Sequence, residues 1–197
     1  MTTEYILNRE VDRVLSALTP VNALIIRAQL ETGLRIGDVL KLEYWQLKNC
    51  FSVVETKTGK SRKVGMTTQL IEDIRSAAWR RGPRQAILDA REGKCTYWAF
   101  PSPVDWRKHR TRQGVWKDVK RAAKAFRLKA NVGTHSMRKV YAVELLKKYG
   151  DIERVRRALN HEDVNVTLIY AIADQLVRDG HLRRVYKGSR RRKTGTS

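Results

Sequence analysis

The amino-acid sequence predicts one mainly α-helical domain with a small antiparallel β-sheet, an α+β fold. Its 197 residues suit a single domain at about 150 residues per domain, and a hydrophobic content of 42% is enough to form a core. Apolar residues recur at helical spacing through most of the chain, whereas residues 51–66 hold two short extended runs around a turn. No stretch approaches about 18 uninterrupted apolar residues, so no membrane span is expected.

The first third of the chain predicts three helices. Asn8 is the expected cap of the first one. Thr19 and Pro20 are a cap and a first-turn proline, so a second helix is expected through about Glu31, with its end at Gly33. A short third helix follows, and its apolar side is formed by Ile36, Val39 and Leu40.

The next stretch changes from the helical period to an extended one. Residues 51–56 and 62–66 flank a turn-forming insert, Lys57-Thr58-Gly59-Lys60, which predicts a β-hairpin. Residues 68–81 return to a helical pattern that Gly82-Pro83 ends. Between 83 and 112 the sequence predicts only a loop around Pro101 and Pro103.

The second half predicts four more helices. The helix over 113–127 is expected to face the core with Trp116, Val119, Ala123 and Phe126. The helices at 134–149, 151–159 and 163–173 follow, the last two capped by Asp151 and Asp163. We expect residues 1–175 to form one domain, and residues 176–197 a C-terminal helix and a basic tail.

The charge of the chain indicates a polyanionic partner. There are 41 Lys and Arg residues against 20 Asp and Glu, a formal net charge of +21. Nucleic acid is the leading candidate, while an anionic membrane surface and non-specific basicity stay open. The two cysteines, Cys50 and Cys95, lack the spacing of a disulfide framework or a four-thiolate zinc site. Together with the absence of a secretory pattern at the N-terminus, this predicts a cytoplasmic location.

Several polar residues are candidates for phosphate chemistry. His135 and Arg138 share one face at a helix start, where a phosphate could bind, or they could form surface ion pairs. Arg35 leaves a tight turn with Asp38 within reach, which also suits a local ion pair. Lys57 at the hairpin tip is either a mobile proton donor or a solvated turn residue.

Two further candidates lie near the end of the chain. His161 follows Leu159-Asn160, and Tyr170 comes nine residues later, after an apolar run. A tyrosine in that position is either part of the core or a nucleophile. A nucleophilic role needs help from its neighbours, because a phenol with a pKa of about 10 is protonated at neutral pH.

The order of these residues resembles the tyrosine recombinases, the phage integrase family. The run Thr32–Leu40 is similar to the first arginine box of that family, and Thr56–Lys60 to its catalytic-lysine hairpin. His135-Ser136-Met137-Arg138-Lys139 is similar to the H-x-x-R box, and Leu159-Asn160-His161 with Tyr170 to the L-G-H box and its tyrosine. Phe100-Pro101 falls where the family has an aromatic-proline stretch.

The resemblance implies the fold of the DNA breaking-rejoining catalytic domain and a role for each matching residue. Tyr170 would attack the scissile phosphate and form a 3′-phosphotyrosine, while Arg35 and Arg138 would hold its non-bridging oxygens. Lys57 would protonate the leaving 5′-oxygen. The remaining members of the set are two assisting histidines, His135 and His161, and a supporting acid, Asp38.

The expected function is therefore site-specific cleavage and rejoining of duplex DNA, in integration, excision or inversion, without metal or other cofactor. A non-catalytic DNA-binding module of the same fold and a DNA-relaxing enzyme of the type IB topoisomerase class stay open as alternatives. We expect DNA contacts from a set of basic residues, which comprises Lys60, Arg62, Lys117, Lys120, Arg121, Lys124 and Lys139. The resemblance also implies a synaptic tetramer, accessory DNA-bending proteins, and a bacterial, archaeal or phage origin with nucleoid association.

The sequence departs from the family pattern at two places. Asn160 replaces the usual glycine of the L-G-H box, and asparagine tolerates the left-handed backbone that a turn there requires. The first arginine box begins at about residue 32, which leaves no room for the usual N-terminal DNA-binding domain. Two explanations stay open, a recombinase of one catalytic domain and a fragment of a longer chain. The apolar residues of the tail, Leu182, Val185 and Tyr186, are expected either to dock on a neighbouring protomer or to pack as an ordinary final helix.

Overall fold

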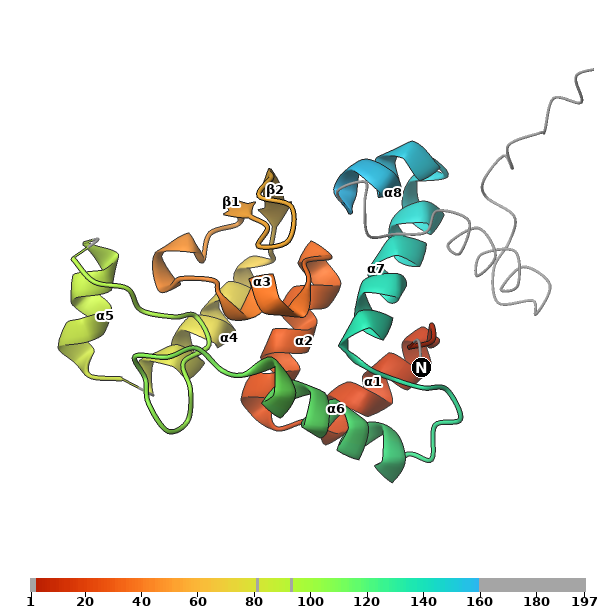
Figure 1. Cartoon of the computed structure of the whole chain (residues 1–197), viewed down its shortest axis with the longest axis horizontal. Helices are drawn as coiled ribbons and strands as arrows, with labels where there is room; N and C mark the ends of the chain where they lie inside the picture. The colour runs from red at the N-terminus through yellow and green to blue at the C-terminus, as the bar shows by residue number, and fades with distance from the viewer. Residues whose placement is uncertain (1–2, 81, 93, 160–197) are drawn as a thin grey trace, which may run out of the picture. The chain divides into compact units, whose positions relative to one another are not determined.

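Helices build most of the structure (Figure 1), a computed structural model that describes residues 3–80, 82–92 and 94–159. The described residues form eight α-helices, one short 3-10 helix and a two-stranded antiparallel sheet. This confirms the predicted fold class. The chain divides into two compact units, residues 1–141 and 142–197.

Helix α2 (Pro20–Thr32) organises the core of the first unit. Its neighbours are α1 (Asn8–Ala17), α3 (Ile36–Leu40), α4 (Thr68–Trp79) and the second strand of the sheet. Ile25 and Ile26 of α2 are fully buried, as are Leu34 and Val39 just beyond its end. The C-terminal turn of α2 therefore lies where helices and sheet meet.

The predicted ends of α2 are confirmed, and the predicted cap of α1 is wrong. Helix α2 spans Pro20–Thr32, and Gly33 ends it in the left-handed conformation with φ +64°. Helix α1 already includes Asn8 as its first residue. The backbone N–H of Leu7, just before the helix, instead donates to the carboxylate of Glu10 at 2.8 Å.

The sheet is the predicted hairpin. Strand β1 (Cys50–Val54) pairs with β2 (Ser61–Gly65) in a register that sets Cys50 opposite Gly65 and Val54 opposite Ser61. Phe51, Val53 and Val64 turn to the core, as the period of two requires. A 3-10 helix over Tyr44–Gln46, η1, precedes β1 and was not predicted.

The segment between α4 and α6 (Arg112–Ala125) contains one helix that the sequence pattern did not predict. Helix α5 (Arg84–Arg91) follows Pro83 and buries only Ala86, Ile87 and Ala90. Eight residues, of which only three are buried, are too short for the helical period to stand out. Backbone hydrogen bonds hold the Phe100-Pro101 stretch: the N–H of Ala99 donates to Leu42, Phe100 accepts from Arg110, and Pro101 forms an isolated bridge with His109.

The orientation of α6 (Arg112–Ala125) corrects one prediction. Val119 and Ala123 are buried as expected, but Trp116 is 45% exposed and Phe126 is 39% exposed. The buried face is centred on Val115, Asp118, Val119, Ala122 and Ala123, and Trp116 lies about 100° from Val115 around the helix. The face was misplaced because the sequence pattern assigned the large aromatic residues to the core.

A buried carboxylate joins α6 to the start of α2. Asp118 accepts hydrogen bonds from the backbone and the hydroxyl of Thr19, both at 2.9 Å, and from Asn22 at 2.8 Å. Burial alone would raise the pKa of Asp118, but the hydrogen bonds from Asn22, Thr19 and Arg121 lower it to about 2. Asp118 therefore serves as an ionised cap for α2, supplied from another helix.

Helix α7 (Thr134–Tyr149) continues from the first unit into the second, where Gly150 ends it with φ +64°. Helix α8 (Ile152–Ala158) is capped by Asp151, whose side chain accepts the N–H of Glu153 at 2.8 Å, which confirms the predicted cap. The predicted helix over 163–173, its cap Asp163 and the tail 176–197 lie outside the described residues. No helix within the described ranges is both long and apolar enough to cross a membrane.

Candidate active site

The predicted site begins at the tight turn that joins α2 to α3. The N–H of Gly33 donates to Gln29 at 2.8 Å and the hydroxyl of Thr32 donates to Ala28 at 2.6 Å, which closes the helix. A Cβ atom on Gly33 would lie 2.3 Å from the ring of Tyr141. The turn therefore requires glycine both for its positive φ and for this close approach, and it sets Arg35 at the start of α3.

A fully buried carboxylate, Glu55, holds the side chain of Arg35. Arg35 Nη1 lies 2.6 Å from Glu55 Oε2. Arg62 approaches the other oxygen, with 3.5 Å between its Nη1 and Glu55 Oε1, and its Nη2 donates to the carbonyl of Thr32 at 2.5 Å. One carboxylate thus bridges two arginines beside the turn.

The loop that carries Lys57 is held by Asp38. The backbone N–H of Thr56 donates to Asp38 Oδ1 at 2.9 Å, and Asp38 Oδ2 lies 4.0 Å from Arg35 Nη1. Lys57 itself is exposed to solvent. The predicted supporting acid therefore contacts both the arginine and the residue beside the lysine.

The H-x-x-R box reaches the same turn from α7. Arg138 is buried, and its Nη1 donates to the carbonyl of Gly33 at 2.6 Å. His135 lies in the first turn of α7 and is exposed. Ser136 between them is buried, and its hydroxyl accepts the N–H of Gly133 at 3.1 Å, which orients the start of the helix.

The structure therefore brings four of the predicted site residues around one turn: Arg35, Asp38, the Lys57 loop and Arg138. Around this turn the positive charges outnumber the negative ones. There are two carboxylates, Asp38 and Glu55, and four basic side chains, Arg35, Lys57, Arg62 and Arg138. Planar guanidinium groups with fixed positions are suited to bind the oxygens of a phosphate. The roles of the individual residues remain predictions.

His161 and Tyr170, the two remaining members of the predicted catalytic set, lie outside the described residues. Within the part of the chain that the structure covers, no three His, Cys, Asp or Glu side chains gather in a way that could hold a metal ion. Both cysteines are free thiols.

The residues predicted to contact DNA differ in their surroundings. Lys60, Lys117 and Lys124 are exposed. Lys120 donates to Asn131 at 2.5 Å, and Arg121 binds Asp118 with 2.6 Å between Nη2 and Oδ1.

The other two residues of that set are directed into the protein. Arg62 is only 10% exposed, and burial lowers its pKa, an effect that nearby Arg35 adds to and Glu55 opposes. Lys139 donates to the carbonyl of Thr3, and burial lowers its pKa although Glu4 opposes the shift. Whether these side chains contact DNA remains a prediction.

Sequence reasoning missed Glu55 and the internal contacts of Arg62. Glu55 stands two residues before Lys57 at the end of an extended run, where a charged side chain is ordinarily solvated. The only signal was the alternation of β1, which places Phe51, Val53 and then Glu55 on the buried side. A charge at the third inward position of such a strand indicates a buried ionic contact.

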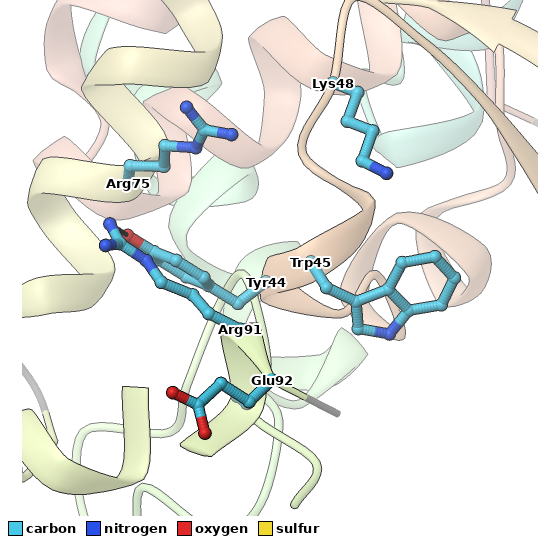
Figure 2. A pocket seen from close by; sticks show the side chains of 7 residues that line it. Tyr44, Trp45, Lys48, Arg75, Arg91 and Glu92 are labelled. Carbon is cyan, nitrogen blue, oxygen red and sulfur yellow. Dashed lines mark hydrogen bonds between the residues drawn. The ribbon is translucent and has the colours of Figure 1, made fainter. Parts of the chain in front are cut away.

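A hollow of about 580 Å³ lies apart from these residues in the sequence, at η1, α4 and α5 (Figure 2). Arg91 stacks over the rings of Tyr44 and Trp79, each 5.7 Å from its guanidinium carbon. Arg75 donates to the carbonyl of Leu47 at 2.7 Å. Figure 2 shows Lys48, Trp45 and Glu92 beside them, and Ala90 lines the hollow as well.

The described helices and hairpin, with Arg35, Asp38 and Arg138 around one turn, have the fold of a tyrosine recombinase catalytic domain. The chain belongs to the phage integrase family, whose sequence profile matches residues 4–176. The resemblance of the motifs is thereby confirmed at the level of the family.

Relatives in bacteria and archaea support this membership. The chain is 26% identical over 149 residues to tyrosine recombinase XerD of Lacticaseibacillus casei, which covers 74% of this chain and 48% of that protein. It is 31% identical over 161 residues to the probable integrase/recombinase protein MJ0367 of Methanocaldococcus jannaschii, covering 76% and 45% respectively. The chain thus spans about half the length of these curated relatives.

Solved structures show the same fold. The XerH site-specific recombinase bound to a palindromic difH substrate, a post-cleavage complex, superposes with a TM-score of 0.66 at 21% sequence identity. The match covers 91% of this chain and 53% of that one.

Proposed function

We propose that this chain cleaves and rejoins duplex DNA at specific sites through a covalent 3′-phosphotyrosine at Tyr170. The observation that carries the proposal is the hydrogen bond from Arg138 to Gly33. It joins the H-x-x-R box to the first arginine box, more than 100 residues away in the sequence, beside the Lys57 loop. Family membership and the DNA complex of a structural neighbour add support.

Each residue has a defined task in this scheme. The Tyr170 oxygen bonds to phosphorus as the bond from phosphorus to the 5′-oxygen breaks, and the phenolic proton leaves to solvent or a base. Arg35 and Arg138 hold the non-bridging oxygens, while Lys57 gives a proton to the departing 5′-oxygen. His135 and His161 assist with hydrogen bonds, and Asp38 orients Arg35 and the Lys57 loop. Rejoining is the reverse reaction, so the ester bond conserves the energy and no nucleotide cofactor is needed.

The same proposal extends to the partners. Duplex DNA would be bound largely through phosphates, by the exposed Lys60, Lys117 and Lys124 among others. With about six phosphate contacts, the logarithm of the binding constant should fall against that of the salt concentration with a slope near −5. A synaptic tetramer, accessory DNA-bending proteins and the choice among integration, excision and inversion belong to this proposal as well.

The test is covalent capture on nicked duplexes. The full chain is incubated in the presence of EDTA with a library of duplexes of randomised sequence, nicked so that a short fragment is lost after cleavage. A protein–DNA adduct that resists detergent is expected for the wild type and for Tyr149→Phe, a matched tyrosine control. It should be absent in Tyr170→Phe, and sequencing of the captured DNA should show one preferred site.

Three results would overturn the proposal. If duplexes shift the protein in native gels without any adduct, the chain is a DNA-binding module. If Tyr170→Phe still forms the adduct, the nucleophile is another residue. Adducts without sequence preference, together with relaxation of supercoiled plasmid, would favour a topoisomerase-like enzyme.

A further inference from the structure

We propose that Glu55 is a positioning residue that holds the Lys57 loop in place beside Arg35. This inference rests on the proposed function, because it concerns how the lysine reaches the leaving oxygen. Glu55 is neither in the predicted catalytic set nor exposed toward a partner, and its carboxylate is fully buried.

The side chain of Glu55 is bound from both sides. Arg35 Nη1 lies 2.6 Å from Oε2, and Arg62 Nη1 lies 3.5 Å from Oε1. Arg62 is itself anchored to the carbonyl of Thr32, in the turn before Arg35. The carboxylate is therefore attached to the arginine turn through two separate guanidinium groups.

The backbone of Glu55 closes the loop in which Lys57 stands. Its N–H donates to the carbonyl of Lys60 at 3.0 Å, and its own carbonyl accepts the N–H of Gly59 at 2.9 Å. Within the loop, the hydroxyl of Thr58 donates to Glu55 Oε2 at 3.5 Å. Residues 55–60 thus form one small closed unit whose base is Glu55.

These contacts tie the loop and the arginine turn into one structure. Lys57 is exposed and lies between Thr56, which donates to Asp38, and Thr58, which donates to Glu55. Glu55 and Asp38 thus hold the loop at two separate points, Glu55 through Thr58 and Asp38 through the backbone N–H of Thr56. A shift of about 1 Å in a reacting group is enough to lower a rate by about 100-fold.

This arrangement predicts a defect specific to the leaving group. A proton donor is needed when the leaving group is an alkoxide. A thiolate needs little such help, because a thiol of pKa about 8.5 is far more acidic than an alcohol. If Glu55 acts by placing Lys57, replacing the scissile 5′-oxygen with sulfur should restore the rate of a Glu55 variant.

The experiment compares single-turnover cleavage of two nicked duplexes that differ only in that bridging atom. Glu55→Gln should cleave the oxygen substrate about 30-fold more slowly than the wild type, within the range that misplacement of a proton donor can cause. On the sulfur substrate the loss should shrink to less than about threefold. Lys57→Ala calibrates the recovery, and Glu72→Gln, at an exposed position on α4, should leave both rates unchanged.

Equal losses on the two substrates would overturn the proposal, since Glu55 would then act through Arg35 or through folding. Unchanged cleavage by a folded Glu55→Gln would overturn it as well. If Glu55→Gln does not fold, as judged by circular dichroism and thermal melting, Thr58→Val decides. It should lose about threefold on oxygen and nothing on sulfur, and equal rates with the wild type on oxygen would count against the proposal.

The same experiment distinguishes failure of the proposed function from failure of the role proposed for Glu55. If the wild type forms no adduct on either substrate, the phosphotyrosine mechanism is wrong. If the wild type is active and the ratio between the substrates stays constant across the variants, only the role of Glu55 is wrong.

Discussion

Two groups of arginines in the first unit are held in opposite ways. Arg35 and Arg62 are 11% and 10% exposed and share the fully buried carboxylate of Glu55. Arg75 and Arg91, at the hollow of Figure 2, are exposed and rest on a backbone carbonyl and on aromatic rings. No ion pair of Arg75 or Arg91 with a carboxylate occurs among the described residues.

The difference shows how burial changes the worth of a charge. Removing one partner from a buried ionic cluster leaves charges that neither water nor a counterion satisfies. An exposed guanidinium stays hydrated on one side, so its loss removes only a weak contact with the ring. Substitutions in the two groups should therefore differ several-fold in how much they lower the free energy of unfolding.

The largest effect is expected from the shared carboxylate. Glu55→Ala should lower the free energy of unfolding by about 3–5 kcal/mol, because it leaves two largely buried guanidinium groups without their common, fully buried partner. Urea unfolding measures this loss. The matched control is Glu92→Ala at the open hollow, where an exposed pair with Lys94 should be worth less than about 0.5 kcal/mol. Similar losses in both variants would contradict the comparison.

The turn beneath the buried group should be nearly as sensitive. Gly33→Ala is expected to cost about 2–4 kcal/mol, from the positive φ and from the collision with Tyr141. Gly59→Ala has almost the same φ, +65°, but open space around its Cβ. It should cost only about 1 kcal/mol, the price of the backbone conformation alone. Equal losses of stability in the two variants would contradict this expectation, because the ring of Tyr141 would then move aside at no energetic cost.

The buried carboxylate of Asp118 extends the comparison to the junction of α2 and α6. Asp118→Asn should lower the stability at pH 7 by about 2 kcal/mol, since the pKa of Asp118 is about 2 against an ordinary value of 3.8. Because this pKa is depressed in the folded state, the contribution is complete above about pH 5. It is lost as the pH falls through about 2, so wild type and variant should converge there. A difference that is constant with pH would contradict this account.

The smallest effect is expected at the open hollow. Arg91→Ala should lower the free energy of unfolding by about 0.5–1 kcal/mol, for the loss of its two aromatic contacts. Arg84→Ala, with a single ring at 6.0 Å, should cost less still. A loss above 2 kcal/mol for Arg91→Ala, again measured in urea, would place this group with the buried one.

The helices that the sequence predicted well are those whose pattern is local. Helix α2 has a proline at its start and Gly33 at its end, and both ends are as predicted. Helix α5 was missed because its eight residues carry too little apolar periodicity. The predicted orientation of Trp116 was wrong because the rotation of α6 about its axis is set by the bond between Asp118 and the start of α2. The size and hydrophobicity of a side chain do not reveal that contact.

The residues of the candidate site differ in the same way: some could be predicted from local motifs and others could not. Arg35, Asp38, Lys57 and Arg138 could be predicted because they stand in motifs of fixed order and spacing, and the structure brings their segments together. Glu55 could not, because its meaning depends on Arg35, 20 residues earlier, and on Arg62 in the opposite strand. Roles for His161 and Tyr170 remain predictions from the motif alone.

By itself the sequence determined the period of each long element, the glycine and proline ends, the excess of positive charge and the family. These properties depend on residues a few positions apart, or on their order along the chain. The tertiary structure alone decided which charges are buried and which are solvated. The cost of burying a charge depends on partners that only folding brings within about 3 Å, and for Arg35 that partner is Glu55.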